Sequence, residues 1–335
     1  MKGEIKMKNT IVFAAMFVGA AVFADAVEDF SGAPWTTWTG KGTIAKATIN
    51  KEEGVAAKGA LQLVYPKGTN GGLLKNFPVE PNTFYSAEIM VKTADPDAVL
   101  ELGVHDFGAD EKYKKIMIRK SFPASTEWKK ISINFLTGSN TKFVRILPNI
   151  MTKTGVPAFF DDFKLAKVEA FEDKDSFEFK NEWSLWKSSV AKMNFSIDKN
   201  EGKSAPAAAK LEILPGNPVK ASGTLMRNIS VLPGKTYTLS IFVKAKDVSP
   251  KTKISLGFQS KDENFKYLGL PIPSTFTTAE NCTDWKQLVL TRKITTTGKW
   301  AKLRNILITL GVGGSEQPGV VFFDDFEIFE EEAEE

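Results

Sequence analysis

The sequence contains two copies of one pattern, and this internal repeat limits the chain to two similar units in tandem. Each copy opens with two tryptophans three residues apart, at residues 35–38 and 183–186. Each copy ends on Phe-Asp-Asp-Phe, at residues 160–163 and 323–326. Since the chain has 335 residues and an ordinary domain has about 150, the repeat predicts two domains, each with its own core.

The two copies stay in step between these ends. In both, a proline turn leads into an alternating strand pattern. The corresponding residues are Asn76, Val79, Pro81, Tyr85, Val91 and Lys92 in the first copy and Asn228, Val231, Pro233, Tyr237, Val243 and Lys244 in the second. Each copy consists of short period-two segments separated by Gly, Pro and Asn, without a long amphipathic helix pattern. This predicts an all-β chain of two tandem β-sandwich domains with a jelly-roll strand order.

The first 24 residues have the features of an export signal. A basic start with Lys2, Lys6 and Lys8 precedes an apolar run that ends before Ala24. Met7 is an alternative start of the same signal. The run is shorter than the roughly 20 residues that span a bilayer, so we expect cleavage after about Ala24 and a secreted, extracellular or periplasmic protein without a stable transmembrane anchor.

The expected domain plan follows from the repeat and the signal. Residues 1–24 form the signal peptide, 25–169 the first sandwich, 174–329 the second, and 330–335 an acidic tail. The single cysteine, Cys282, rules out an intramolecular disulfide. Packing, with the help of a metal ion, is then expected to hold the domains together.

Charge and motifs exclude several classes of function. The net charge is only +4, and the lysines are scattered, which is unlike a nucleic-acid binder. The chain shows no Ser/His/Asp or Cys/His set and no glycine-rich phosphate loop. The acidic pairs are adjacent in sequence, whereas the carboxylates of a glycosidase flank the bond from separate strands. We therefore expect a protein that is not an enzyme.

Several segments of both copies resemble the carbohydrate-binding modules of families four, nine and twenty-two. These are the phenylalanine near each start, Pro-Gly-Lys-Thr-Tyr-Thr-Leu-Ser at residues 233–240, Phe-Val-Lys-Ala at 242–245, the tryptophan in mid-domain and the closing Phe-Asp-Asp-Phe. The second copy is the closer match. The resemblance implies a galactose-binding-like jelly roll, glycan binding, usually as an appendage to a glycoside hydrolase, and a structural Ca²⁺ near the chain ends of each module.

The resemblance also implies where calcium would bind. Asp161 and Asp324, at the last strand of each copy, are the expected ligands, with Asp162 and Asp325 as alternatives in register. Glu178 matches the acidic step that follows the first phenylalanine, a place where the first copy has serine. Calcium takes several oxygen ligands. The alternative is that these aspartates accept hydrogen bonds from the backbone.

Strand parity predicts which side chains face a ligand, because alternate residues of a half-buried strand point away from the core. Polar and aromatic groups on the outward parity suit sugar hydroxyls and sugar rings. The alternative is an ordinary solvated sheet face. The late strand is interpreted as carrying Arg145 and Asn149 outward in the first copy and their equivalents Asn305 and Thr309 in the second. The complete set is Glu101, His105, Phe107, Arg145, Asn149, Phe242, Gln259, Tyr267, Asn305 and Thr309.

The tryptophans are expected to serve the core. Their large apolar area favours burial, and their recurrence in both copies favours a structural role. The residues concerned are Trp35, Trp38, Trp128, Trp183, Trp186 and Trp285.

Two functions remain open from the sequence. The preferred one is a secreted, non-catalytic polysaccharide-binding protein whose two modules act together on one ligand. The alternative is a structural or cell-envelope protein whose sandwiches assemble by protein contacts without binding sugar. The expected partners are a glycan and, beyond it, glycoside hydrolases or envelope proteins.

Overall fold

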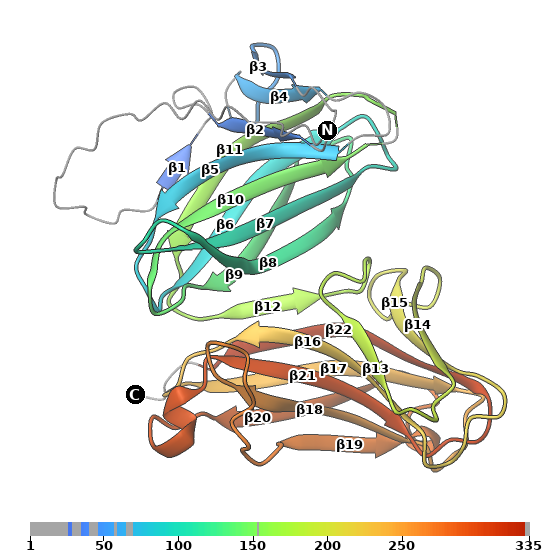
Figure 1. The fold of residues 1–335 in the computed structure, drawn as a ribbon. Helices are drawn as coiled ribbons and strands as arrows, with labels where there is room; N and C mark the ends of the chain where they lie inside the picture. Colours follow the sequence, from blue (N-terminus) through green and yellow to red (C-terminus); the bar gives the residue numbers. More distant parts are fainter. Residues whose placement is uncertain are drawn as a thin grey trace, which may run out of the picture.

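The chain folds into antiparallel sheets with two short 3₁₀ turns, which confirms the all-β prediction (Figure 1). The expected signal peptide lies outside the residues that this computed structural model describes, and so do residues 332–335 of the acidic tail. The described residues are 26–28, 35–39, 46–56, 59–64, 70–152 and 154–331. Within these ranges no helix is long and apolar enough to cross a bilayer.

Module 1, as we call strands β1 to β11, is a sandwich of two sheets. The first sheet has the order β3-β4-β11-β6-β9, with β1 (Ala26–Glu28) paired to β11. Its other strands are β3 (Lys46–Asn50), β4 (Ala60–Val64), β11 (Ala158–Lys167), β6 (Phe84–Thr93) and β9 (Lys129–Leu136). The second sheet is β2 (Thr36–Thr39), β5 (Asn70–Pro78), β10 (Thr141–Met151), β7 (Val99–Gly108) and β8 (Tyr113–Pro123), in that order.

Module 2, strands β12 to β22, repeats this topology strand for strand. Its first sheet has the order β14-β15-β22-β17-β20, with β12 (Glu172–Asp175) paired to β22. The other strands are β14 (Met193–Asp198), β15 (Ala208–Ile213), β22 (Gly319–Glu330), β17 (Thr236–Lys246) and β20 (Lys286–Lys293). The second sheet is β13 (Ser184–Lys187), β16 (Ser222–Ser230), β21 (Asn305–Gly313), β18 (Lys253–Lys261) and β19 (Ser274–Thr278), in that order.

The repeated residues explain why both copies adopt the same fold. The phenolic oxygens of Tyr85 and Tyr237 accept hydrogen bonds from the backbone N–H groups of Glu80, at 3.0 Å, and Leu232, at 2.9 Å. Each bond ties the proline turn to the strand that follows it. The residue after that proline has a positive φ in both copies, 52° at Asn82 and 92° at Gly234, a conformation that asparagine and glycine tolerate best.

The first tryptophan of each pair belongs to the core. Trp35 packs edge-on against Phe163, with ring centroids 5.2 Å apart, and Trp183 packs in the same way against Phe326, at 5.3 Å. Both phenylalanines are fully buried. The closing Phe-Asp-Asp-Phe is therefore a core motif, and it lies within β11 and β22 rather than at their ends.

The core prediction is wrong for the other four tryptophans. Trp38 and Trp186 are 41% and 50% exposed. A residue three positions further along an extended strand points to the opposite face, so both tryptophans of a pair cannot enter the core. Trp128 and Trp285 are half-buried; the ammonium groups of the corresponding lysines, Lys92 and Lys244, lie 5.4 and 5.9 Å from their ring centroids.

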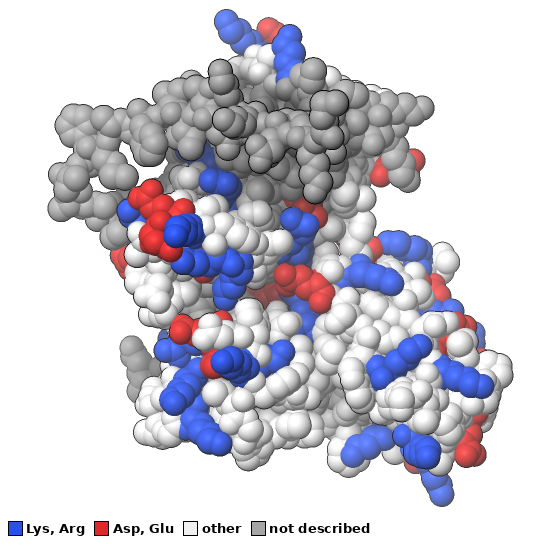
Figure 2. All heavy atoms as spheres, viewed as in Figure 1, with Lys and Arg blue, Asp and Glu red and all other residues white. Residues whose placement is uncertain are grey.

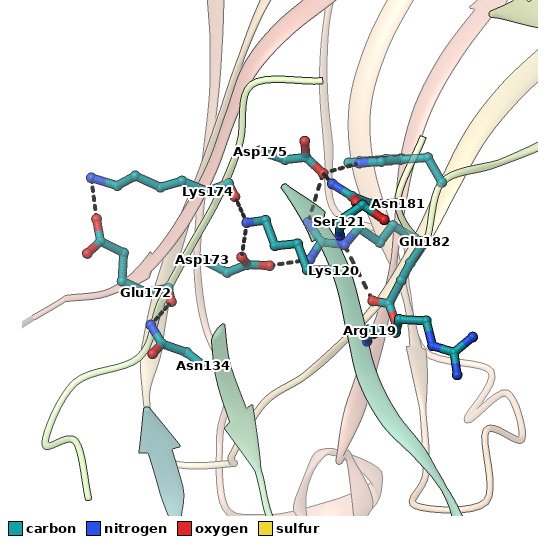
Figure 3. A network of polar contacts seen from close by, with 12 residues as sticks. Arg119, Lys120, Ser121, Asn134, Glu172, Asp173, Lys174, Asp175, Asn181 and Glu182 are labelled. Atoms are coloured by element: carbon teal, nitrogen blue, oxygen red, sulfur yellow. Dashed lines mark hydrogen bonds and ion pairs between the residues drawn. The ribbon is translucent and has the colours of Figure 1, made fainter. Parts of the chain in front are cut away.

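The two modules are joined along an edge strand of module 1. The backbone N–H groups of Arg119 and Ser121, on β8, donate to Glu182 Oε1 at 3.3 Å and to Asn181 Oδ1 at 2.8 Å (Figure 3). Side chains of module 2 thereby satisfy an edge that would otherwise be open to pairing. Figure 2 shows acidic and basic side chains next to one another where the modules meet.

A buried arginine lies at the centre of this junction. The side chain of Arg227, on β16, is 1% exposed, and its Nη2 lies 2.5 Å from Asp173 Oδ2. Asp175 and Glu182 lie 3.6 and 3.7 Å from the same guanidinium group. Lys120 of module 1 reaches the other oxygen of Asp173 at 3.3 Å. Burial raises the pKa of Glu182, and the charge of Arg227 opposes this shift.

Apolar contacts also cross the junction. Phe84 and Leu136 of module 1 belong to the same buried cluster as the core of module 2. The ring of Phe84 stacks on that of Phe171, with centroids 4.9 Å apart. The modules therefore share part of one core.

Candidate functional site

An aromatic-edged row of residues crosses the outer face of the five-stranded sheet of module 2. Strand pairing places Trp186 beside Thr224, Thr224 beside Gly311, Gly311 beside Ser255, and Ser255 beside Phe276. Trp186 and Phe276, at the two ends, are 50% and 60% exposed. Four steps of about 4.8 Å between strands separate these aromatic residues by roughly 19 Å.

The row lies over a groove of about 400 Å³. Its floor is formed by small side chains, because Gly311 lies between Thr224 and Ser255. A Cβ atom at Gly311 would come within 2.7 Å of Ser255 Oγ, so the groove depends on glycine there. The lining residues are Ser222, Gly223, Thr224, Lys251, Lys253, Ser255, Gly311, Val312, Gly313 and Gly314. At one edge, Lys253 Nζ lies 4.1 Å from the ring centroid of Phe276.

The equivalent row of module 1 is filled by side chains. Strand pairing places Trp38, Gly72, Asn149, Glu101 and Ser121 next to one another in that order. Asn149 Nδ2 donates to Glu101 Oε1 at 3.1 Å. A Cβ atom at Gly72 would lie 1.8 Å from Asn149 Oδ1, so glycine makes room for the amide. The same oxygen is buried and has no hydrogen-bond partner within the described ranges.

The structure brings the five predicted residues of module 1 onto one face. His105 and Arg145 are paired across β7 and β10. Phe107 lies beneath Arg145, with 4.6 Å between the guanidinium carbon and the ring centroid. Phe107 is buried by neighbours on this outer face, since its ring also stacks on that of Phe143, with centroids 4.7 Å apart. The register between β7 and β8 shifts between Asp106 and Phe107. Glu101 and Asn149 lie four residues away along the same two strands, β7 and β10.

The predicted residues of module 2 are more dispersed. Gln259 and Thr309 lie on the outer face of the same sheet as the groove. Asn305 is 2% exposed, donates to Asp262 O at 2.8 Å and accepts from Ser230 Oγ at 2.9 Å, so its amide holds a loop. Phe242 lies on β17, in the other sheet. Tyr267 lies in the loop after β18, beneath Lys261 at 4.8 Å.

The strand register corrects one equivalence. Arg145 pairs with Asn76 and His105 in module 1, and in module 2 the residue between the corresponding Asn228 and Gln259 is Leu307. Asn149 likewise corresponds to Gly311. The equivalents Asn305 and Thr309, expected from the sequence, are two residues out of register, because hydrophobic alternation is unchanged by a shift of two.

Sequence reasoning missed the groove and the exposed aromatic residues at the ends of the two rows. Trp186 and Phe276 of module 2 and Trp38 of module 1 were not among the predicted ligand contacts. Two tryptophans three residues apart are a usable signal for the first two, since only one of them can face the core. Phe276 has no comparable signal, because its strand begins after a long loop.

The predicted calcium ligands lie at a feature that both modules share. Asp161 Oδ2 accepts the backbone N–H of Val55 at 2.8 Å, and Asp324 Oδ2 accepts that of Lys203 at 2.6 Å. Burial raises the pKa of Asp324 to about 6. Within the described ranges no group of three or more His, Cys, Asp or Glu side chains is placed to hold a metal. Calcium at Asp161, Glu178 and Asp324 therefore stays a prediction.

A cavity of about 510 Å³ lies where the modules meet. It is lined by strand β8 of module 1 and by Phe242, Gln287 and Glu178 of module 2. The ammonium nitrogen of Lys203 lies 4.4 Å from the ring centroid of Phe242. Phe242 and Glu178 thus lie at the junction, away from the groove.

The family comparison covers most of the first module. Residues 23–149 match the family model described as Carbohydrate binding domain. This match confirms the resemblance to carbohydrate-binding modules that the motifs indicate. It falls on the first copy, although the quoted motifs are closer in the second. No curated protein matches the sequence.

Three solved structures match the chain at low sequence identity and low TM-score. The N-terminal CBM22-1–CBM22-2 tandem domain of Paenibacillus barcinonensis Xyn10C matches with 15% identity and a TM-score of 0.35, over 92% of this chain and 99% of that one. The CBM22-1 and GH10 modules of Clostridium thermocellum xylanase 10B, complexed with xylohexaose, match with 18% identity and a TM-score of 0.34, over 43% of this chain and 28% of that one. TmCBM61 in complex with β-1,4-galactotriose matches with 17% identity and a TM-score of 0.31, over 42% of this chain and 91% of that one.

Proposed function

We propose that the chain is an exported, non-catalytic protein that binds polysaccharide through the outer faces of both modules. The observation that carries this proposal is the row of module 2 in which Trp186 and Phe276 stand at the ends and the middle residues line a groove with Gly311 in its floor. The match of residues 23–149 to a carbohydrate-binding family supports the same role for module 1.

The groove suits a sugar chain for physical reasons. Exposed aromatic faces at both ends can stack on the apolar sides of sugar rings. Between them, Thr224 and Ser255 offer hydroxyl groups that both donate and accept hydrogen bonds, as sugar hydroxyls do. A floor without large side chains lets a chain lie across the strands in contact with all of these groups.

A binding role without catalysis fits the chemistry of the faces. Hydrolysis of a glycosidic bond needs two carboxyl groups about 5 to 9.5 Å apart across the substrate. The lining of the groove includes no carboxylate. On module 1, Glu101 is paired with Arg119 at 3.3 Å and with Asn149. Any catalytic partner, such as a glycoside hydrolase, or an envelope protein would then be a separate molecule or domain.

A structural calcium belongs to the same proposal. In module 2, Asp324 would hold the ion together with carbonyl oxygens of the turn that it ties down. That turn is tight: a Cβ atom at Gly202 would lie 1.5 Å from the carbonyl oxygen of Ala205 and 2.7 Å from that of Ala207. The Asp324 carboxylate accepts hydrogen bonds from the backbone N–H groups of Lys203 and Asp325, so a bound calcium ion would take its further oxygen ligands from the carbonyl groups of this turn. Glu178 is the further expected ligand.

A glycan array on the chain without its first 24 residues tests the binding function. We expect selective binding of one polysaccharide class. Trp186→Ala or Phe276→Ala should weaken it by about tenfold, since loss of one aromatic contact costs about 1.4 kcal/mol. Val289→Ala, an exposed residue on the opposite sheet, is the matched control. Failure to bind any glycan would favour the assembly function instead.

A further inference from the structure

Module 1 carries an arginine on its outer face that no acidic side chain neutralises. Arg145 projects from β10 between Asn76 on β5 and His105 on β7. Its Nε donates to Asn76 Oδ1 at 2.8 Å. Neither terminal nitrogen of its guanidinium group has a hydrogen-bond or ion-pair partner in the parts of the chain that the structure describes. The terminal nitrogens therefore keep a planar pair of donors for a ligand.

The guanidinium group is held in place before any ligand arrives. It lies over the ring of Phe107, 4.6 Å from the centroid, and Phe107 is itself stacked on Phe143 with an angle of 13° between the rings. The bond to Asn76 fixes its rotation. An arginine stacked on one face and hydrogen-bonded at Nε presents its other two nitrogens in the geometry of a bidentate anion contact.

The neighbours of Arg145 add positive charge. Arg119 and His105 lie on the same face, and Glu101, the acidic residue of this face that pairs with Arg119, also accepts from Asn149. Burial lowers the pKa of His105, and the charges of Arg119 and Arg145 lower it further. Burial also lowers the pKa of Arg145. Both shifts describe a site where positive charge lacks a counter-ion.

The matching position of module 2 lacks these features. Leu307 stands where module 1 has Arg145, and Gln259 where it has His105. The asparagine is retained as Asn228, but it accepts a hydrogen bond from Lys261 at 3.2 Å. The arginine and its phenylalanine support are thus a property of module 1, whereas module 2 has a lysine, Lys261, over the ring of Tyr267.

We propose that the outer face of module 1 binds an acidic polysaccharide, with Arg145 as the specificity-determining residue that pairs with a carboxylate or sulfate group of the sugar. This inference rests on the proposed carbohydrate-binding function and adds the chemical class of ligand for one of the two modules. Tyr113 supplies an aromatic surface beside the anion site, since its ring centroid lies 5.5 Å from that of His105 and the residue is 52% exposed.

The test measures binding of the chain without its first 24 residues to two matched pairs of polymers. Polygalacturonate is compared with its methyl ester, and dextran sulfate with dextran. We expect binding to one acidic polymer and at least tenfold weaker binding to its neutral partner, because a charge-assisted bidentate contact is lost. The pair that shows the difference identifies carboxylate or sulfate as the recognised group.

Variants assign the effect to Arg145. Arg145→Met should weaken acidic binding roughly tenfold, and Arg145→Lys should restore only part of it, since lysine lacks the planar fork. Lys293→Met, at an exposed position of β20 in the other sheet of module 2, removes the same charge and should change acidic binding less than about twofold. Equal effects of the two methionine variants, or equal binding of acidic and neutral polymers, would overturn the proposal. Loss of binding to every glycan would instead refute the proposed function, and thermal unfolding of each variant checks its fold.

Discussion

The outer faces of the two five-stranded sheets differ although their strands have the same order and register. In module 1 the middle of the central row is Asn149, which reaches across to Glu101. In module 2 the same place is Gly311, and the row becomes the floor of a groove between Trp186 and Phe276. One face is filled with charged and amide groups, and the other is open and lined with small residues.

This difference shows which positions of a duplicated sandwich are free to diverge. Residues of inward parity, such as Leu100 and Ile254, are fully buried in both copies, because each must fill a similar core. Residues of outward parity contribute little to that core, so a change there costs little stability. A shared fold therefore does not imply a shared ligand.

The largest expected effect is a loss of stability at the junction, where the two modules differ at one position. Arg227 stands where module 1 has Lys75, and it is buried among Asp173, Asp175 and Glu182. We expect Arg227→Ala to destabilise the chain by about 3–5 kcal/mol, because it leaves buried carboxylates without a counter-charge. Chemical denaturation measures this. Lys75→Ala is the matched control on the equivalent strand, and an equally large loss there would show that the position, not the junction, is responsible.

Removal of calcium should affect module 2 more than module 1, because Glu178 has no acidic counterpart in the first copy. At a free calcium concentration 100 times the dissociation constant, binding stabilises the folded state by about 2.7 kcal/mol. We therefore expect a chelator to lower the unfolding temperature, and Asp324→Asn to abolish this response more fully than Asp161→Asn. An unfolding temperature that does not change with calcium would leave both aspartates as ligands of backbone N–H groups only.

Placing an asparagine in the groove of module 2 tests whether its openness matters. In Gly311→Asn the new Cβ atom would start 2.7 Å from Ser255 Oγ, and the amide would fill the floor as Asn149 does in module 1. We expect neutral-glycan binding to fall by about thirtyfold, equivalent to about 2 kcal/mol. Isothermal titration calorimetry measures it. Ser274→Ala on β19, two strands away in the same sheet, is the control, and an unchanged affinity would place the sugar elsewhere.

Much of this fold could be predicted from the sequence. The repeat, the alternating segments and the paired Pro and Tyr residues specify two similar sandwiches, because local turn chemistry and strand parity act over a few residues. Tyr85 and Tyr237 illustrate this, since each bonds to a backbone group only five residues away.

The arrangement of the outer faces was harder to predict, because it depends on register between strands that are distant in sequence. Parity assigned Arg145 and His105 to one face correctly, but alternation alone could not align Arg145 with Leu307 rather than Asn305. Phe276 contributes to the groove only because β19 pairs with β18 in a particular register. The burial of Arg227 likewise depends on how the two modules dock.

The smallest expected effect is a pH dependence confined to module 1. The groups around His105 are Arg145 on β10, Arg119 and Tyr113 on β8, and Glu101 on its own strand. Because its pKa is lowered from 6.5, His105 is neutral at pH 7 and gains a proton only below its ordinary range. An acidic ligand attracts that proton and is in turn held more tightly by the protonated ring.

Affinity for the acidic polymer should therefore increase two- to fivefold as the pH falls through the lowered pKa of His105, consistent with an exposed charge pair of about 0.4–1 kcal/mol. A carboxylate ligand remains ionised until the pH approaches about 4, where carboxyl groups titrate. His105→Gln installs the residue of module 2 and should remove the dependence, while neutral-glycan binding at the groove stays constant with pH. A pH dependence that survives in His105→Gln would belong to another group and would separate His105 from the anion site.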